Sequence, residues 1–317
     1  MSRISLIFLS VFVLFSCGGD SEKGTDKRKR KAGKEKSEIE GVINMNGDEL
    51  ISSLIVEFGK NFRNDYNKVQ VNSTASDSET ALHELDNGNA DVIFISTPCS
   101  MLDNKKYHCT PVFSDYLVLI VNFNNVDLQA LVRYGISQKQ LSLLLQGKVS
   151  DWQQISKGVE SKEPVKLYIP SKKSGVIHYL SEFADTDIDL IQADDLLKEK
   201  EIPETVGNIP ISIGICSHTL AYNHQTTYRR NGIYILGIDF DNSNFLENEE
   251  LIFDDMNELQ IAVKTGKAHP SLHRNFSIVY RKDSKKIELL ELFNEHVQGT
   301  GKTVIEKYKF YHFTKTK

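Results

Sequence analysis

Short apolar segments alternate with amphipathic segments along this chain, and that alternation limits the fold more than any other feature. Asp91–Ile95 and Ile209–Cys216 are apolar runs of strand length, typical of strands buried on both faces of a parallel sheet. Between such runs, apolar residues recur at helical spacing, as in Leu50, Leu54, Ile55, Phe58 and Phe62. The order strand, helix, strand predicts an α/β fold with a parallel sheet.

The same patterns place the remaining elements. We expect strands at 42–45, 69–72, 116–121, 165–169 and 273–280. We expect one helix whose inward apolar residues are Ala81, Leu82 and Leu85, and a second over 137–145. A third has Ile177, Leu180 and Phe183 inward, and a long fourth helix lies within 286–308. Ser76 with Glu79 predicts a capping box, and Ser174 predicts another helix N-cap.

The N-terminus has the pattern of an export signal. Arg3 precedes the uncharged apolar stretch Ile4–Phe15, which is too short to span a bilayer. Leu14-Phe15-Ser16-Cys17 then resembles the lipobox of bacterial lipoproteins, which implies a signal peptide over 1–16 and acyl chains on Cys17. The alternative is an ordinary cleaved signal with a chance cysteine.

Residues 17–40 form a predicted acylated cysteine and disordered basic tether, because the segment has almost no apolar side chains. Its basic run Lys27–Lys36 is either a solvated spacer or a segment that adheres to anionic lipid headgroups. Once Arg3 and the eight basic and six acidic residues of the tether are set aside, residues 41–317 carry a net charge of −8. An acidic body of this kind argues against nucleic acid as a partner.

Three cysteines remain in the body. Cys99 and Cys109 lie close together in sequence and, in an oxidising compartment, could form a disulfide. Cys216 lies in an apolar run and is expected to be buried. No spacing resembles a zinc site, and no serine–histidine–aspartate arrangement or nucleophile elbow is present in the sequence, so we expect no cofactor and no enzymatic activity.

Four segments of the body carry recognisable motifs: Asn46–Glu49, Gly88–Ser96, Gln146–Trp152 and Gly299–Tyr308. Together they resemble the phosphate-binding (PstS-like) substrate-binding proteins of ABC transporters. Asn46–Glu49 corresponds to the first phosphate loop of that family, and Gly88–Ser96 is similar to its "G-x-x-D-I-…-S" strand. Gln146-Gly-Lys-Val-Ser-Asp-Trp152 resembles the turn "F-x-G-K-I-T-N-W", and Gly299–Tyr308 resembles the C-terminal helix. The resemblance covers residues 42–312.

This resemblance implies a periplasmic-binding-protein-like fold of type II, with two α/β lobes, a double-crossing hinge and a ligand cleft. Lobe I would comprise residues 41–115 and 272–317, and lobe II residues 116–271. A small-molecule ligand, an ABC permease and, through the lipid anchor, a membrane are the implied partners. We expect a monomer in the bacterial cell envelope, with the outer membrane favoured, facing the periplasm or the cell surface.

The resemblance also implies ligand contacts, from Asn46, Gly47, Asp48, Glu49, Ser76, Asp77, Ser78, Ser96, Thr97, Lys173, Ser174 and Gly175. Three departures weaken an anion site: Pro170 stands near the position of the family's arginine, Val176 lacks a hydroxyl, and Glu49 replaces a threonine. Two hypotheses follow: a receptor for phosphate or a related oxyanion, or a divergent adaptor, sensor or receptor for a neutral or cationic ligand. The loop residues could also serve only as helix caps.

Overall fold

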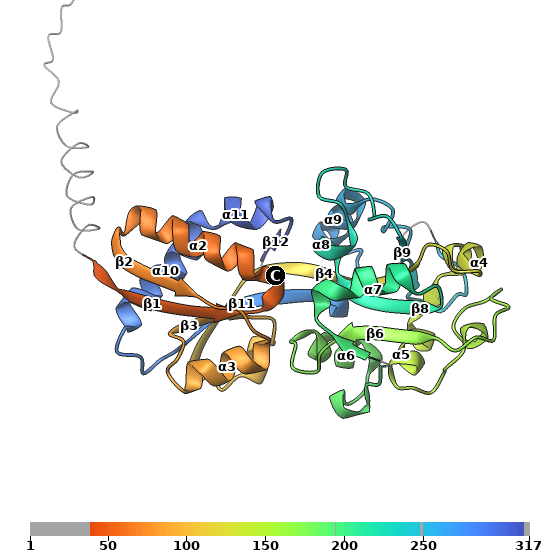
Figure 1. Ribbon diagram of the computed structural model, residues 1–317, viewed down its shortest axis with the longest axis horizontal. Helices are drawn as coiled ribbons and strands as arrows, with labels where there is room; N and C mark the ends of the chain where they lie inside the picture. The colour runs from red at the N-terminus through yellow and green to blue at the C-terminus, as the bar shows by residue number, and fades with distance from the viewer. Residues whose placement is uncertain (1–38, 194, 248–249, 314–317) are drawn as a thin grey trace, which may run out of the picture.

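The computed structural model describes residues 39–193, 195–247 and 250–313. The expected signal peptide, Cys17 and nearly all of the tether lie outside the described residues. The described residues form two α/β lobes joined by two long strands, β4 (Tyr107–Asn122) and β11 (His273–Arg281) (Figure 1). The predicted fold class is therefore confirmed.

The first lobe is built on β1 (Glu40–Gly47), β2 (Lys68–Ser73) and β3 (Val92–Ile95). β1 pairs in parallel with β2 and β3, whereas β11 pairs antiparallel with both β3 and β4. The sheet is therefore mixed: the predicted parallel pairing is present among β1, β2 and β3, and β11 adds antiparallel pairs that the sequence did not predict. The reason is topological, because β11 returns from the second lobe and runs against the other strands.

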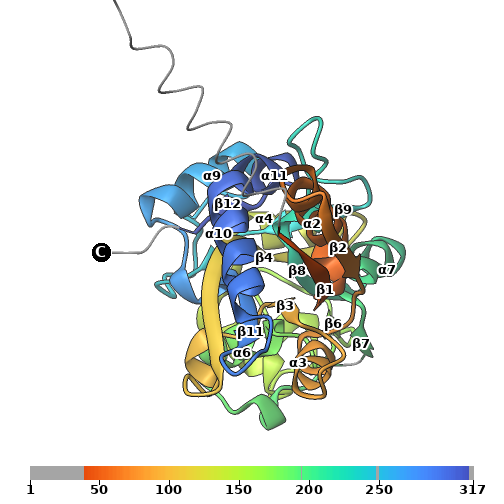
Figure 2. The same ribbon diagram turned by 90° about the vertical axis from the view of Figure 1, so that its left-hand side faces the viewer.

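Helices cover both faces of this sheet. α2 (Ser52–Asp65), α10 (Ile287–Thr300) and α11 (Lys302–Lys307) lie on one face, and α3 (Ser78–Asp86) lies on the other (Figure 2). Successive β3 residues point to opposite faces, so Phe94 packs with the α2 cluster and Ile93 packs with α3.

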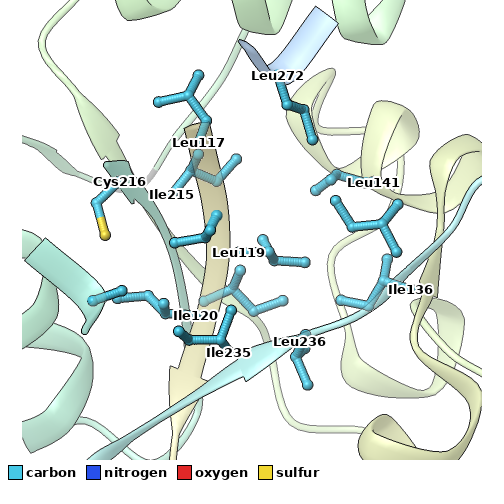
Figure 3. Packing of buried hydrophobic residues seen from close by; sticks show 14 of the residues in the cluster. Leu117, Leu119, Ile120, Ile136, Leu141, Ile215, Cys216, Ile235, Leu236 and Leu272 are labelled. Carbon is cyan, nitrogen blue, oxygen red and sulfur yellow. The ribbon is translucent and has the colours of Figure 1, made fainter. Parts of the chain in front are cut away.

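The second lobe contains β8 (Ser212–Ser217), β6 (Lys166–Pro170) and β7 (Asp195–Leu197), with β9 (Ile233–Leu236) paired to β4. Figure 3 shows part of its core, where Leu117 and Leu119 of β4 pack near Ile215 of β8. Its helices are α4 (Leu128–Tyr134), α5 (Gln138–Leu145), α6 (Val176–Ala184), α7 (Ile202–Asn208), α8 (His218–Ala221) and α9 (Met256–Thr265). A two-stranded sheet joins β5 (Ile136–Ser137) to β10 (Ile238–Asp239), and β12 (Tyr311–His312) pairs with β4.

The hinge is marked by a change of partners along β4. Tyr107–Tyr116 pairs with β11, and from Leu117 onward β4 pairs with β8 and β9. The apolar cores divide near the same point, since Phe113 belongs to the core of the first lobe and Tyr116 to that of the second. We keep the domain boundaries after residues 115 and 271 as a proposal, and call the two parts lobe I and lobe II.

Three local expectations were wrong. The N-cap of α3 is Asp77, whose carboxylate accepts hydrogen bonds from the backbone and hydroxyl of Thr80, so Ser76 and Glu79 form no capping box. The N-cap of α6 is Gly175 rather than Ser174. The C-terminal helix is interrupted at Gly301, where a side chain would collide with the Val297 carbonyl.

Two further observations concern cysteines and membranes. Cys99 and Cys109 form a disulfide with a Cα–Cα distance of 5.7 Å, and Cys216 is a buried free thiol. Within the described residues, no helix combines the length and apolar character needed to cross a bilayer.

Candidate functional site

A cavity of about 250 Å³ lies between the two lobes, beside the hinge. Both lobes contribute to its wall, and ligand sites occur preferentially at such interfaces between domains. Five of the residues predicted from the sequence line it, namely Asp48, Glu49, Ser76, Asp77 and Ser174. The remaining lining residues are Leu50, Pro170, Ser171, Leu197, Lys198, Glu199 and Lys200.

Asp48 lies at the carboxyl end of β1, where the neighbouring parallel strand β3 also ends. Its carboxylate accepts hydrogen bonds from the Leu50 backbone N–H at 3.1 Å and from Ser96 Oγ at 3.2 Å. The side chain is buried, and this burial raises the pKa of Asp48 despite the nearby positive charge of Arg274. When neutral, a carboxyl group can donate a hydrogen bond to a ligand, whereas the ionised carboxylate can only accept one.

Three other predicted residues shape the wall without lining the cavity. Asn46 is buried and its side-chain oxygen accepts a hydrogen bond from the Gly47 N–H at 2.6 Å. A side chain at Gly47 would approach the Phe94 carbonyl oxygen to 2.6 Å, so glycine is required there. Ser78 Oγ accepts a hydrogen bond from the Ser96 N–H at 3.2 Å.

The N-terminus of α3 faces the opposite lobe, but protein atoms already accept its hydrogen bonds. The Thr80 N–H donates to Asp77 Oδ1 at 2.8 Å, and the Glu79 N–H donates to the Lys173 carbonyl across the cleft at 3.1 Å. Backbone N–H groups at helix N-termini are the usual donors to a bound oxyanion. At α3, two of these donors are therefore used within the protein.

Lobe II closes against lobe I at several points. Gly175 lies so close to Ser96 and Thr97 that a Cβ atom would be 2.6 Å from the Thr97 nitrogen. Lys198 forms an ion pair with Glu49 at 3.0 Å, and Lys200 Nζ lies 3.3 Å from Ser52 Oγ. Thr97 and Lys173 thus contribute to contact between the lobes rather than to the cavity wall.

A buried ion network under the cavity was not predicted from the sequence. Arg274 of β11 is fully buried and donates to both carboxylate oxygens of Asp115 on β4. The same guanidinium donates to Glu199 at 2.8 and 3.0 Å, and Glu199 also accepts the Ser217 N–H at 2.7 Å. Glu199 lines the cavity, so the network joins the hinge to the site.

The opposite charges in this network stabilise one another. Burial favours the neutral form of Asp115, but the charge and hydrogen bonds of Arg274 outweigh it and lower the pKa of Asp115. Arg274 itself stays protonated, but it does not line the cavity and donates to Asp115 and Glu199, so it does not replace the arginine that is missing near Pro170. An arginine within an apolar strand is the signal that could have identified Arg274, since arginine is almost never fully buried unless it is paired.

The cavity carries more negative than positive charge. Its lining includes four carboxylates, from Asp48, Glu49, Asp77 and Glu199, and two ammonium groups, from Lys198 and Lys200. Arg274 adds a third positive charge beneath the wall, but its guanidinium is already paired with Asp115 and Glu199. A fully ionised oxyanion would therefore enter a site whose positive charges are already matched by the protein's own carboxylates.

Comparison with known protein families now identifies the fold. The model of the PBP superfamily domain matches residues 25–295, which is most of the chain. The chain belongs to the PBP superfamily. No curated protein sequence matches it.

Solved structures with the same PBP fold include several described as phosphate-binding proteins. A phosphate ABC transporter substrate-binding protein with bound phosphate from Clostridium perfringens is 13% identical with a TM-score of 0.62, over 86% of this chain and 100% of that one. An ABC-type phosphate transport receptor from Vibrio cholerae is 15% identical with a TM-score of 0.59, over 86% and 100%. PstS from Borrelia burgdorferi is 18% identical with a TM-score of 0.52, over 87% and 100%. At these identities the likeness shows a shared fold.

Proposed function

We propose that this protein is a lipid-anchored solute-binding protein of an ABC importer that holds a small solute in the interlobe cavity without catalysis. The observation that supports this most is the cavity itself, which lies beside the hinge and takes its wall from both lobes. Closure over such a cavity links ligand capture to a change of shape that a permease can recognise. We further propose that it acts as a monomer outside the cytoplasm, with the outer membrane favoured.

Phosphate or a related oxyanion is the first ligand candidate. Hydroxyl groups of Ser76, Ser171 and Ser174 lie in the cavity wall, together with the ammonium groups of Lys198 and Lys200. The buried carboxyl group of Asp48, whose pKa is raised, fits an anion that accepts a hydrogen bond. Structures with the same fold include one solved with phosphate bound.

A neutral or cationic solute, or an adaptor role, is the second candidate. It is favoured by the carboxylates in the wall and by the α3 N–H groups that protein oxygens already engage. Removing an anion from water into a site with matched charges costs more than it does into a site with unused donors.

Isothermal titration separates these candidates. If the first is correct, phosphate or arsenate binds with a dissociation constant of about 1 μM or below, equivalent to at least about 8 kcal/mol. Lys198→Met and Lys200→Met should each weaken that binding at least about tenfold, because an ammonium group would be lost from the wall. Lys148→Met, at an exposed position of lobe II, is the matched control. Absence of heat with phosphate, arsenate and sulfate would contradict the oxyanion proposal and leave the second candidate.

The lipid anchor is tested separately in cells. Wild-type protein should incorporate labelled palmitate and sediment with membranes, because several acyl chains make a stable anchor. Cys17→Ala should abolish both labelling and sedimentation, whereas Cys216→Ala should change neither. Membrane association of the Cys17→Ala protein would contradict the proposal that lipid on this cysteine is the anchor.

A further inference from the structure

Three carboxylates converge in lobe II, one at the end of β10 and two in the segment between β10 and α9, outside the interlobe cavity. Asp239, Asp241 and Glu250 each offer an oxygen atom, and these atoms all lie within 4.8 Å of one another. None of the three residues lines the cavity between the lobes. The solute site therefore does not account for this cluster.

Two of these carboxylates are buried without a counter-charge. Asp239 is 1% exposed and Glu250 is 8% exposed. Backbone N–H groups donate to both, those of Ser243 and Asn244 to Asp239 and those of Phe240 and Glu247 to Glu250. Asp239 also shares a side-chain hydrogen bond with Asp241, so two acidic groups meet there without a cation. Within the described part of the chain, no lysine, arginine or histidine forms an ion pair with either one. Buried carboxylates are normally paired with a cation or coordinate a metal, because an isolated buried charge is costly.

The spacing of the acidic residues points independently to calcium. Counting Asp239 as position one, Asp241 is position three, Ser243 is five, Phe245 is seven, Glu247 is nine and Glu250 is twelve. A twelve-residue calcium loop takes its ligands from these six positions, with a backbone carbonyl at seven and a glutamate at twelve. Positions ten and eleven, Asn248 and Glu249, lie outside the described residues and correspond to no ligand position.

The residue at position six is the turning point of a calcium loop and is normally glycine. Here it is Asn244, with a φ of +66°, a left-handed conformation that asparagine adopts more readily than other non-glycine residues. Ser243 Oγ and the Phe245 carbonyl oxygen, at positions five and seven, lie 3.0 Å apart. Leu246, at position eight, packs against Gly135 and Gly237, which ties the loop to lobe II.

We propose that the described residues 239–247 and 250 form a calcium site, with ligands from the side chains of Asp239, Asp241, Ser243 and Glu250 and the Phe245 carbonyl, and with Glu247 acting directly or through water. A cation there would neutralise the buried carboxylates and connect β10 to the segment that leads into α9. Calcium fits better than magnesium, because calcium accepts six to eight protein oxygens in flexible geometry. The site is independent of the solute that the cleft binds.

The test is calcium titration of the purified protein after treatment with a chelator. We expect one site per chain by isothermal titration calorimetry, with a dissociation constant between about 1 μM and 1 mM. The melting temperature should rise with calcium concentration, since a ligand that binds only the folded state stabilises it. Magnesium at the same concentration should give a smaller rise. Terbium luminescence provides a second readout. The Tyr134 ring lies 5.4 Å from the ring of Phe245, a residue of the loop, and can sensitise the emission of a terbium ion bound there.

Two loop variants and a control complete the test. Asp241→Asn changes an exposed position and should lower calcium affinity at least about tenfold without unfolding the protein. Glu250→Gln should abolish binding, and Glu160→Gln, an exposed glutamate elsewhere in lobe II, should leave it unchanged. Absence of calcium heat and of any rise in melting temperature at millimolar calcium would overturn the proposal. Equal calcium affinity in the Asp241→Asn, Glu250→Gln and wild-type proteins would overturn it as well.

Discussion

Replacing Arg274 by methionine is expected to lower the free energy of unfolding by about 3–5 kcal/mol. The guanidinium is fully buried and bonded to Asp115 and Glu199, so its removal leaves two buried carboxylates without a positive partner. Methionine fills much of the same volume. The loss of stability therefore reflects the missing charge more than a change in packing. Urea denaturation monitored by circular dichroism at neutral pH measures the difference.

Arg281→Met is the matched control for this variant. Arg281 lies on the same strand, but its ion pair with Asp283 is exposed, and such pairs contribute at most about 1 kcal/mol. A triple variant that also carries Asp115→Asn and Glu199→Gln should recover part of the stability lost in Arg274→Met, because it removes the unpaired charges. A loss below about 1 kcal/mol in Arg274→Met would show that the buried network is not required for stability.

Gly175→Ala is expected to prevent closure of the lobes while leaving each lobe folded. A Cβ atom there would collide with backbone atoms of Ser96 and Thr97 in lobe I. The backbone of Gly175 has a φ of −60°, which alanine adopts without strain, so the effect arises only between the lobes. If the cleft binds phosphate, its affinity should fall at least about tenfold, a loss of about 1.4 kcal/mol.

Amide hydrogen exchange measures closure without any ligand. The Glu79 N–H donates to the Lys173 carbonyl across the cleft, whereas the neighbouring Thr80 N–H donates to Asp77 within lobe I. In Gly175→Ala, exchange at Glu79 should accelerate at least about tenfold while Thr80 stays protected. Gly299→Ala, where no atom lies within 4 Å of the added carbon, is the control. Unchanged protection of the Glu79 N–H in Gly175→Ala would show that the added carbon does not prevent closure, which would contradict this prediction.

Much of the fold follows from local patterns in the sequence. The apolar run that contains Val92–Ile95 is buried as predicted, and the helical stripe Leu54, Ile55, Phe58 and Phe62 faces the core. These predictions succeed because the spacing of apolar residues along a short segment is enough to indicate a strand or a helix and its buried side. The direction of β11 could not be obtained this way, because it depends on where the chain returns after the whole of lobe II.

The candidate site was predicted only in part. Loops that follow strands or precede helices were identifiable, and five of their residues line the cavity. Glu199 lies in the charged run Lys198–Glu201, which resembles solvated surface in sequence, and its partner Arg274 is distant along the chain. The acidic residues after β10 were not predicted as a site for a different reason: their side chains are oxygen ligands, whereas zinc-type spacing concerns cysteine and histidine.

The pairing of the two hinge strands determines how the lobes can move. From Tyr107 to Tyr116, β4 is bonded to β11 as an antiparallel ribbon, and Arg274 ties the two strands together again through Asp115. A hydrogen-bonded ribbon bends across its face far more easily than it shears along its length. We therefore expect the lobes to rotate about a single axis at the hinge. The two walls of the cleft would then come together in the same alignment each time the cleft closes.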